Sequence, residues 1–135
     1  MFFKKTENHN ENEGLIKVAA LLIHVAKVDE NYSQHEEEII KKTLLELGAS
    51  EKNINDIINN GTRIEKDSNQ ILEFTKEVKN MDNKDKIKIT ENLWRIIYSN
   101  NEADIYETSL MRRLAGLLYI DSKTMGDIKS KIKNE

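Results

Sequence analysis

Apolar residues recur at intervals of three and four along most of this 135-residue chain, and no segment alternates polar and apolar residues as a strand does. The chain has no proline and 5 glycines, so few residues interrupt a helix. Residues 15–28 are apolar around almost the whole circumference of a helix, apart from a polar stripe at Lys17, His24 and Lys27. That pattern is typical of a central, buried helix. The sequence predicts an all-α fold.

Caps and apolar stripes predict about seven helices, and a chain of this length is enough for a single compact domain. Ser33 with Glu36, and Asp104 with Glu107, have the spacing of capping boxes at the starts of two helices. The third helix is expected to end near Gly61. The expected helices begin at or near residues 15, 33, 50, 67, 83, 104 and 121.

The sequence contains an internal duplication with an offset of 71 residues. The offset aligns the pairs Leu22 and Leu93, Val25 and Ile96, Asp29 and Asn100, Ser33 and Asp104, Glu36 and Glu107, and Lys41 and Arg112. Turns and caps that coincide are harder to obtain by chance than aliphatic pairs. The offset predicts two pseudo-symmetric helix–turn–helix units bridged by the two shorter helices.

Composition argues against several classes of function. The chain has 24 acidic and 21 basic residues, a net charge of -3, which argues against binding to a nucleic-acid backbone. It has no cysteine and 3 scattered histidines, which argues against a thiolate or catalytic zinc site. Gly-rich phosphate loops and nucleophile elbows are absent as well. We therefore expect a protein that is not an enzyme.

The N-terminal residues bear on location. Residues 1–13 are almost entirely polar after Phe3, so they do not resemble a secretory signal. We expect a flexible polar leader over residues 1–13, a helical domain over residues 14–135, no membrane span and a cytoplasmic location.

The two predicted turns between paired helices are rich in oxygen-bearing side chains at relative positions 1, 3, 5 and 8. Hard divalent cations such as Ca²⁺ bind six to eight oxygens, and alternate residues of a tight turn can supply them. The candidate ligands are Asp29, Asn31, Ser33 and Glu36 in the first turn and Glu102, Asp104 and Glu107 in the second. Neither turn is an EF-hand, because the required Gly and terminal Glu are missing. The alternative is that these residues serve only as helix caps and turn formers.

Both turns resemble those of the TerB-like family, which comprises tellurite-resistance protein B and its relatives. Residues 26–36 read Ala-Lys-Val-Asp-Glu-Asn-Tyr-Ser-Gln-His-Glu and are similar to the family's first acidic turn. The second turn is the closer match, since Tyr106-Glu107 leads into the run Leu110–Ala115. The likeness covers residues 14–130. It implies about seven helices with internal pseudo-symmetry, acidic turns proposed to bind divalent cations, and an association with stress responses such as tellurite resistance.

The resemblance also assigns positions. Asp29 and Glu36 match the family's acidic positions in the first turn, and Asp104 and Glu107 match those in the second. Asn100 departs from the pattern, and the lost carboxylate weakens any second site. We expect a non-enzymatic domain that binds Ca²⁺ or Mn²⁺. The alternative is a protein–protein interaction module with an unidentified partner, in which the turns act only as caps.

Overall fold

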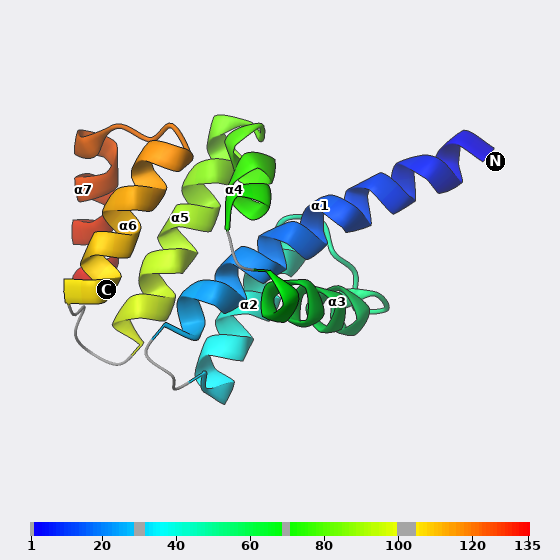
Figure 1. The fold of residues 1–135 in the computed structure, drawn as a ribbon, viewed down its shortest axis with the longest axis horizontal. Coiled ribbons are helices and arrows are strands. Elements are labelled where there is room, and N and C mark those ends of the chain that lie inside the picture. Colours follow the sequence, from blue (N-terminus) through cyan, green and yellow to red (C-terminus); the bar gives the residue numbers. More distant parts are fainter. Residues whose placement is uncertain (1, 29–31, 69–70, 100–104) are drawn as a thin grey trace.

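The computed structural model describes residues 2–28, 32–68, 71–99 and 105–135, with side chains from residue 12 of the first range and residue 106 of the last. Every regular element in these ranges is an α-helix (Figure 1). The helices are α1 (Phe2–Ala26), α2 (Gln34–Glu46), α3 (Ile54–Asp67), α4 (Leu72–Lys79), α5 (Asn83–Tyr98), α6 (Ile105–Leu117) and α7 (Ser122–Lys133). The predicted single all-α domain is confirmed. None of the described helices is long and apolar enough to cross a membrane.

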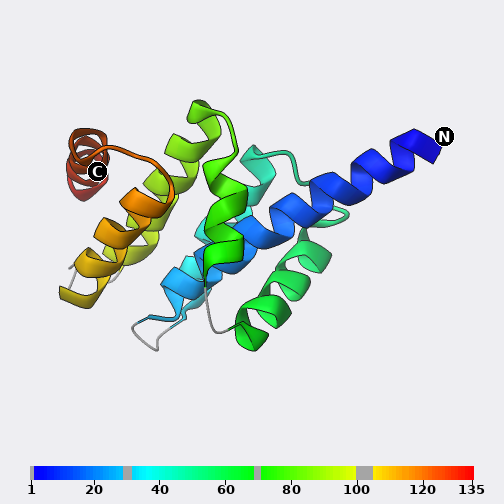
Figure 2. The same ribbon diagram turned by 45° about the horizontal axis from the view of Figure 1, so that its top comes forward.

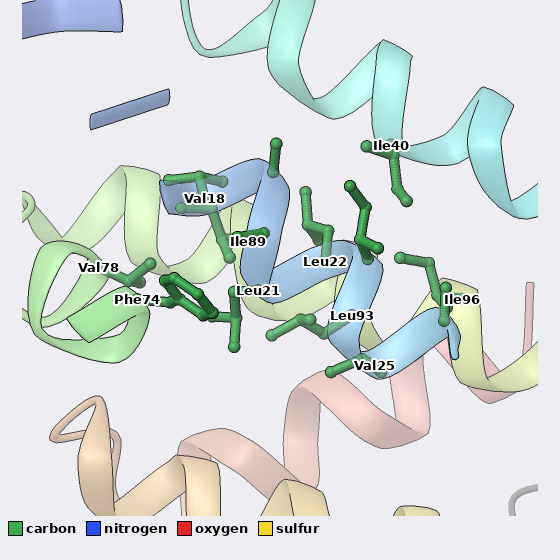
Figure 3. Close-up of a cluster of buried hydrophobic side chains, with 14 of the residues drawn as sticks. Val18, Leu21, Leu22, Val25, Ile40, Phe74, Val78, Ile89, Leu93 and Ile96 are labelled. Atoms are coloured by element: carbon green, nitrogen blue, oxygen red, sulfur yellow. The ribbon is translucent and has the colours of Figure 1, made fainter. Parts of the chain in front are cut away.

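Helix α1 forms the centre of the fold, as the apolar run predicts. It packs against α2, α3, α4 and α5 (Figures 1 and 2). Residues 18–23 are completely buried. Figure 3 shows Leu21 and Leu22 of α1 among apolar side chains from other helices, including Phe74 of α4 and Leu93 of α5. Burying apolar surface on all sides of one helix is the main favourable contribution to folding here.

The predicted polar stripe of α1 contacts glutamates on two neighbouring helices. His24 Nδ1 lies 3.2 Å and Lys27 Nζ 2.9 Å from the Glu65 carboxylate of α3. Lys17 Nζ lies 3.9 Å from Glu77 of α4. The stripe therefore faces the edges of α3 and α4 rather than the apolar core.

Helix α1 begins earlier than the periodicity predicts. It was expected from Leu15 and begins at Phe2, and its N-terminal half extends beyond the other helices (Figures 1 and 2). The polar residues 2–13 carry no strong helix breaker, so their backbone continues the helix. That residues 1–13 form a flexible leader stays a prediction.

Helix α3 does not end near Gly61, as expected, but continues to Asp67. Gly61 is buried inside the helix, where α3 lies against α1. A Cβ at this position would lie 2.8 Å from Ala19 Cβ, 3.2 Å from Ala20 N and 3.2 Å from Ile16 O. The glycine therefore permits close packing of two helices instead of terminating one.

Replacing Gly61 with alanine should lower the free energy of unfolding by about 1 to 2 kcal/mol, because the new methyl overlaps rigid atoms of α1. The matched control is Gly126→Ala on α7, where a Cβ meets no heavy atom within 4 Å. That change should raise the free energy of unfolding by about 0.5 to 1 kcal/mol through helix propensity. Urea unfolding of both variants measures the difference, and equal stabilities would contradict the close approach.

The structure extends the internal repeat to a third helix, because α3 and α7 occupy corresponding places. In the turns that precede them, corresponding backbone hydrogen bonds recur at an offset of 71 residues. Ala49 N donates to Leu44 O at 2.9 Å, and Ile120 N donates to Ala115 O at 2.9 Å. The backbone φ is positive at Gly48 and at its counterpart Tyr119, 117° and 58°.

The caps of α3 and α7 correspond too. Asn53 N donates to Ser50 Oγ at 3.3 Å, and Thr124 N donates to Asp121 Oδ1 at 2.7 Å, again 71 residues apart. Helix α3 packs on α1 and α7 packs on α5. The repeated unit is therefore α1–α2–α3 and α5–α6–α7, with α4 between the two copies.

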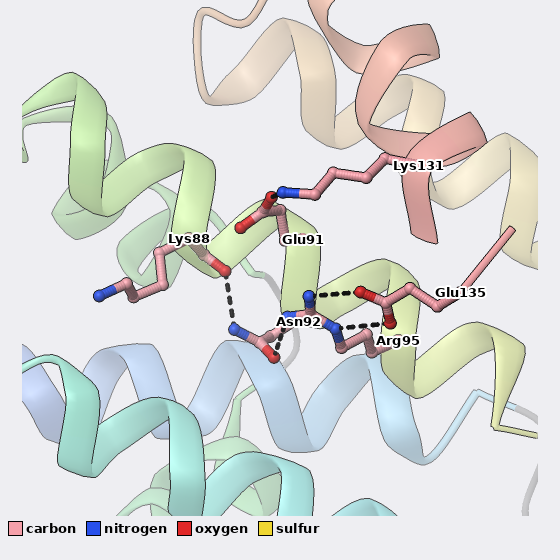
Figure 4. A network of polar contacts seen from close by, with 6 residues as sticks. All are labelled: Lys88, Glu91, Asn92, Arg95, Lys131 and Glu135. Carbon is pink, nitrogen blue, oxygen red and sulfur yellow. Dashed lines mark hydrogen bonds and ion pairs between the residues drawn. The ribbon is translucent and has the colours of Figure 1, made fainter. Parts of the chain in front are cut away.

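Polar contacts join the C-terminal end of the chain to α5 (Figure 4). Arg95 donates from Nε and Nη2 to the two oxygens of Glu135, at 3.0 and 2.7 Å. This guanidinium holds the pKa of the Glu135 carboxyl below its usual value. Lys131 Nζ lies 2.6 Å from Glu91 of α5. These bonds hold the C-terminal end of α7 against α5.

Candidate functional site

The first acidic turn ends in a capping box. Ser33 Oγ accepts a hydrogen bond from Glu36 N at 3.2 Å, and Ser33 N donates to Glu36 Oε1 at 2.8 Å. The backbone of Ser33 is extended, as an N-cap requires. The capping box predicted from the spacing is confirmed. One oxygen of Glu36 is therefore engaged in capping α2.

Glu36 is nevertheless buried, since its residue is 1% exposed. A carboxylate at the start of a helix is normally solvated, because helix starts lie at the surface. Burial of this charge therefore requires compensating partners, and the bond from Ser33 N supplies one of them.

Tyr32, at the same turn, has a raised pKa. Its phenol is half-buried, and its pKa is raised to about 12 by burial first and then by the charges of Glu37 and Glu36. Both causes disfavour the phenolate. Tyr32 is not among the residues that the sequence predicts for this site, although its place one residue before the cap is a usable signal.

Stability at high pH should depend on Tyr32. Because its folded-state pKa lies above the ordinary 10.0, the folded state keeps a proton that the unfolded state loses. The free energy of unfolding should therefore fall as the pH rises from about 10 to about 12. Tyr32→Phe removes this part of the fall, which urea unfolding near pH ~9 and pH ~11 measures. An identical pH dependence in both proteins would contradict the assignment.

A hollow of about 330 Å³ adjoins the first turn. Its lining consists of Tyr32, Ser33, Gln34, Glu37, Glu38 and Lys41. Two carboxylates contribute to it, and Lys41 Nζ lies 3.8 Å from Glu37. The hollow therefore contains oxygens that a cation prefers, together with one ammonium that opposes a cation.

The second turn is described only from its C-terminal side. Glu107, on the first turn of α6, is 5% exposed, whereas the neighbouring Tyr106 is 81% exposed. Glu107 is the counterpart of Glu36 at the 71-residue offset, and both carboxylates are buried. The two copies of the repeat thus place a buried glutamate at the same point of their second helix.

Four predicted ligands, namely Asp29, Asn31, Glu102 and Asp104, lie outside the described residues. Ser33 and Glu36 are brought together, and Glu107 lies in the other copy of the repeat. Among the residues that the structure describes, no three His, Cys, Asp or Glu side chains form a group suited to a metal. The complete ligand set stays a prediction.

The comparisons with known proteins agree with the fold. The family model described as tellurite resistance protein TerB matches residues 15–130, which include both acidic turns and all or part of each of the seven helices. The chain matches no curated protein and no solved structure. Because the match spans most of the sequence, the chain belongs to the TerB family of tellurite-resistance proteins.

Proposed function

We propose that this TerB-family domain binds a divalent cation, Ca²⁺ or Mn²⁺, at its acidic turns and performs no catalysis. The observation that carries the proposal is the burial of Glu36 and Glu107 at equivalent positions of the repeat. Carboxylate oxygens are the ligands that hard divalent cations prefer, and each copy of the repeat supplies one at this position. Both glutamates directly follow loops whose sequences are rich in oxygen-bearing side chains.

The potential at the first turn supports the same proposal. Burial is the first cause of the raised pKa of Tyr32, and the charges of Glu37 and Glu36 raise it further. Those two charges would attract a positive ion placed there. The second turn has Asn100 in place of a carboxylate, so we expect the first turn to bind more tightly.

Paramagnetic Mn²⁺ locates such a site directly. Substoichiometric Mn²⁺, added to ¹⁵N-labelled protein, should broaden the amide signals of Ser33 and Glu36 first and that of Glu107 next. The amides of Ser122 and Lys123 serve as controls, because they lie beyond the far end of α6 from Glu107 (Figure 1). Excess Ca²⁺ should restore the broadened signals. Uniform weak broadening, or none at these glutamates, would contradict the proposal.

The second candidate function is a protein–protein interaction module in which the turns act only as helix caps. The reciprocal bonds between Ser33 and Glu36 favour it, because they assign a structural role to both residues without any ion. Under this alternative Mn²⁺ leaves the signals of both turns unchanged. Ser33→Ala then costs about 1 kcal/mol, the usual value of an N-cap, whether or not a cation is present.

The family description extends the proposal to physiology. We infer that cation binding by this domain serves a stress response of the tellurite type. Growth of a tellurite-sensitive host on potassium tellurite, with and without the chain, tests this point. Protection should be lost in Glu36→Gln and kept in Glu73→Gln, whose side chain is exposed on α4. Equal protection by both variants would show that the stress role does not depend on the first acidic turn.

A further inference from the structure

A pocket of about 570 Å³ lies between α5, α6 and α7, away from the capping box of the first turn. Its lining comprises Trp94, Thr108, Arg112, Ala115, Gly116, Ile120, Asp121, Ser122, Met125, Gly126 and Lys129. The volume falls within the range of about 300–1,000 Å³ that is typical of sites for small molecules.

The repeat explains why the space exists in the second unit. At the 71-residue offset, Leu44, Leu45 and Ile58 of the first unit correspond to Ala115, Gly116 and Lys129. Leu44 and Ile58 are buried, whereas Leu45 is 38% exposed. The second unit thus has alanine and glycine where the first unit has two leucines, and lysine where the first unit has isoleucine. The lining of the pocket therefore departs from the repeat at three positions.

The floor of the pocket is apolar and aromatic. Trp94 is 2% exposed and Met125 is 7% exposed. The indole Nε1 donates to the Met125 sulfur at 3.2 Å, so the polar atom of the ring already has a partner. Trp94 therefore contributes a small apolar area of its ring to the floor of the pocket.

Two cations line the same pocket above this floor. Lys129 Nζ lies 5.4 Å from the centroid of the Trp94 ring, and Arg112 is exposed on α6. The pocket's one carboxylate, Asp121, accepts the Thr124 N–H at 2.7 Å as the cap of α7. The lining therefore carries a net positive charge next to an aromatic surface.

We propose that this pocket binds a small organic anion, with its apolar body on Trp94 and Met125 and its negative group paired with Lys129 and Arg112. Lys129 Nζ lies over the Trp94 ring, so a positive charge and an apolar surface are close enough for one small ligand to contact both. The proposal does not depend on cation binding at the acidic turns, and its test uses different residues.

Fluorescence tests the proposal, because Trp94 is the chain's single tryptophan. The probe is 8-anilinonaphthalene-1-sulfonate, an aromatic anion that accepts energy from tryptophan. The neutral comparison is N-phenyl-1-naphthylamine, which has the same rings without the sulfonate. We expect the anion to bind one equivalent and to quench Trp94, and the neutral probe to bind at least about tenfold more weakly, a difference of one decade in dissociation constant. Equal binding of the two probes, or no quenching, would overturn the proposal.

Two variants locate the probe. Gly116→Leu restores the residue of the first unit, and a Cβ there meets no heavy atom within 4 Å. This variant should keep or raise the unfolding midpoint while weakening the anion at least about tenfold. The control Ser109→Leu adds the same side chain at an exposed site of α6 outside the pocket lining and should bind normally.

Lys129→Met tests the charge. It should weaken the anion about fivefold, the scale of a partly exposed ion pair, and leave the neutral probe unchanged. The control Lys123→Met removes an exposed charge from the same helix outside the pocket lining and should have no effect. Unaltered anion binding in folded Gly116→Leu or in Lys129→Met would place the ligand elsewhere and contradict the proposal.

Discussion

Replacing Leu22 with alanine is expected to lower the free energy of unfolding by about 3 to 5 kcal/mol, the range for a fully buried leucine whose site cannot collapse. Leu22 is 0% exposed near the C-terminal end of α1, with Ile40 of α2 and Leu93 of α5 in the same cluster (Figure 3). Because α1 packs against four other helices, a cavity there removes contacts from several helices at once. Chemical denaturation measures the loss.

The matched control is Leu72→Ala at the start of α4, where the leucine is 46% exposed. It should lower the free energy of unfolding by less than about 1 kcal/mol, because less apolar area leaves water on folding. Similar losses at the two positions would show that α1 is not the centre of the core.

Saturating Ca²⁺ or Mn²⁺ is expected to stabilise the domain, because an ion that binds the folded state alone shifts the folding equilibrium. At 100 times the dissociation constant the gain is about 2.7 kcal/mol. For a domain of this size that raises the unfolding midpoint by roughly 10 °C. Thermal denaturation with and without each ion, after removal of bound metal by a chelator, measures the shift.

Substitutions assign the shift to the turns. Glu36→Gln keeps an acceptor for Ser33 N, since glutamine also serves in capping boxes, but it removes the charge that a hard cation needs. We expect Glu36→Gln and Glu107→Gln to keep the fold, because the amide preserves the size of the side chain and a hydrogen-bond acceptor, and at least one of them to abolish the ion-induced shift. Glu73→Gln, which removes an exposed carboxylate from α4, should keep the full shift. If all three variants keep the full ion-induced shift, neither buried glutamate is a cation ligand, and the ion binds elsewhere.

The architecture followed from the sequence where local patterns decide it. The apolar circumference of residues 15–28 predicted a buried central helix, and Val18 and Leu22 are fully buried. The spacing of Ser33 and Glu36 predicted a cap, and the reciprocal bonds confirm it. Both predictions rest on residues close together in the sequence, so no tertiary contact was needed to make them.

The sequence was misleading where tertiary packing decides. Gly61 looked like a helix terminator, but its role is to let α3 approach Ala19 of α1, a contact 42 positions away along the chain. The start of α1 was misplaced because a polar helical segment has no apolar stripe to mark it. In both cases a local pattern had two structural explanations, and packing selected between them.

The candidate site was predicted only in part for the same reason. Spacing placed Glu36 and Glu107 after acidic loops, but their burial depends on how α2 and α6 pack and could not be read from spacing. The pocket beside Trp94 is also a packing feature. Its sequence signal is visible only when Ala115 and Gly116 are aligned with their larger counterparts in the first unit.

Calorimetric titration of the chelator-treated protein with Ca²⁺ and with Mn²⁺ tests the central proposal most directly. The account predicts saturable heat for at least one of these ions, with a stoichiometry of one when the first turn alone binds and two when both turns bind. It also predicts that Glu36→Gln removes the tighter event. The absence of saturable heat for both ions at millimolar concentration would contradict cation binding by this domain.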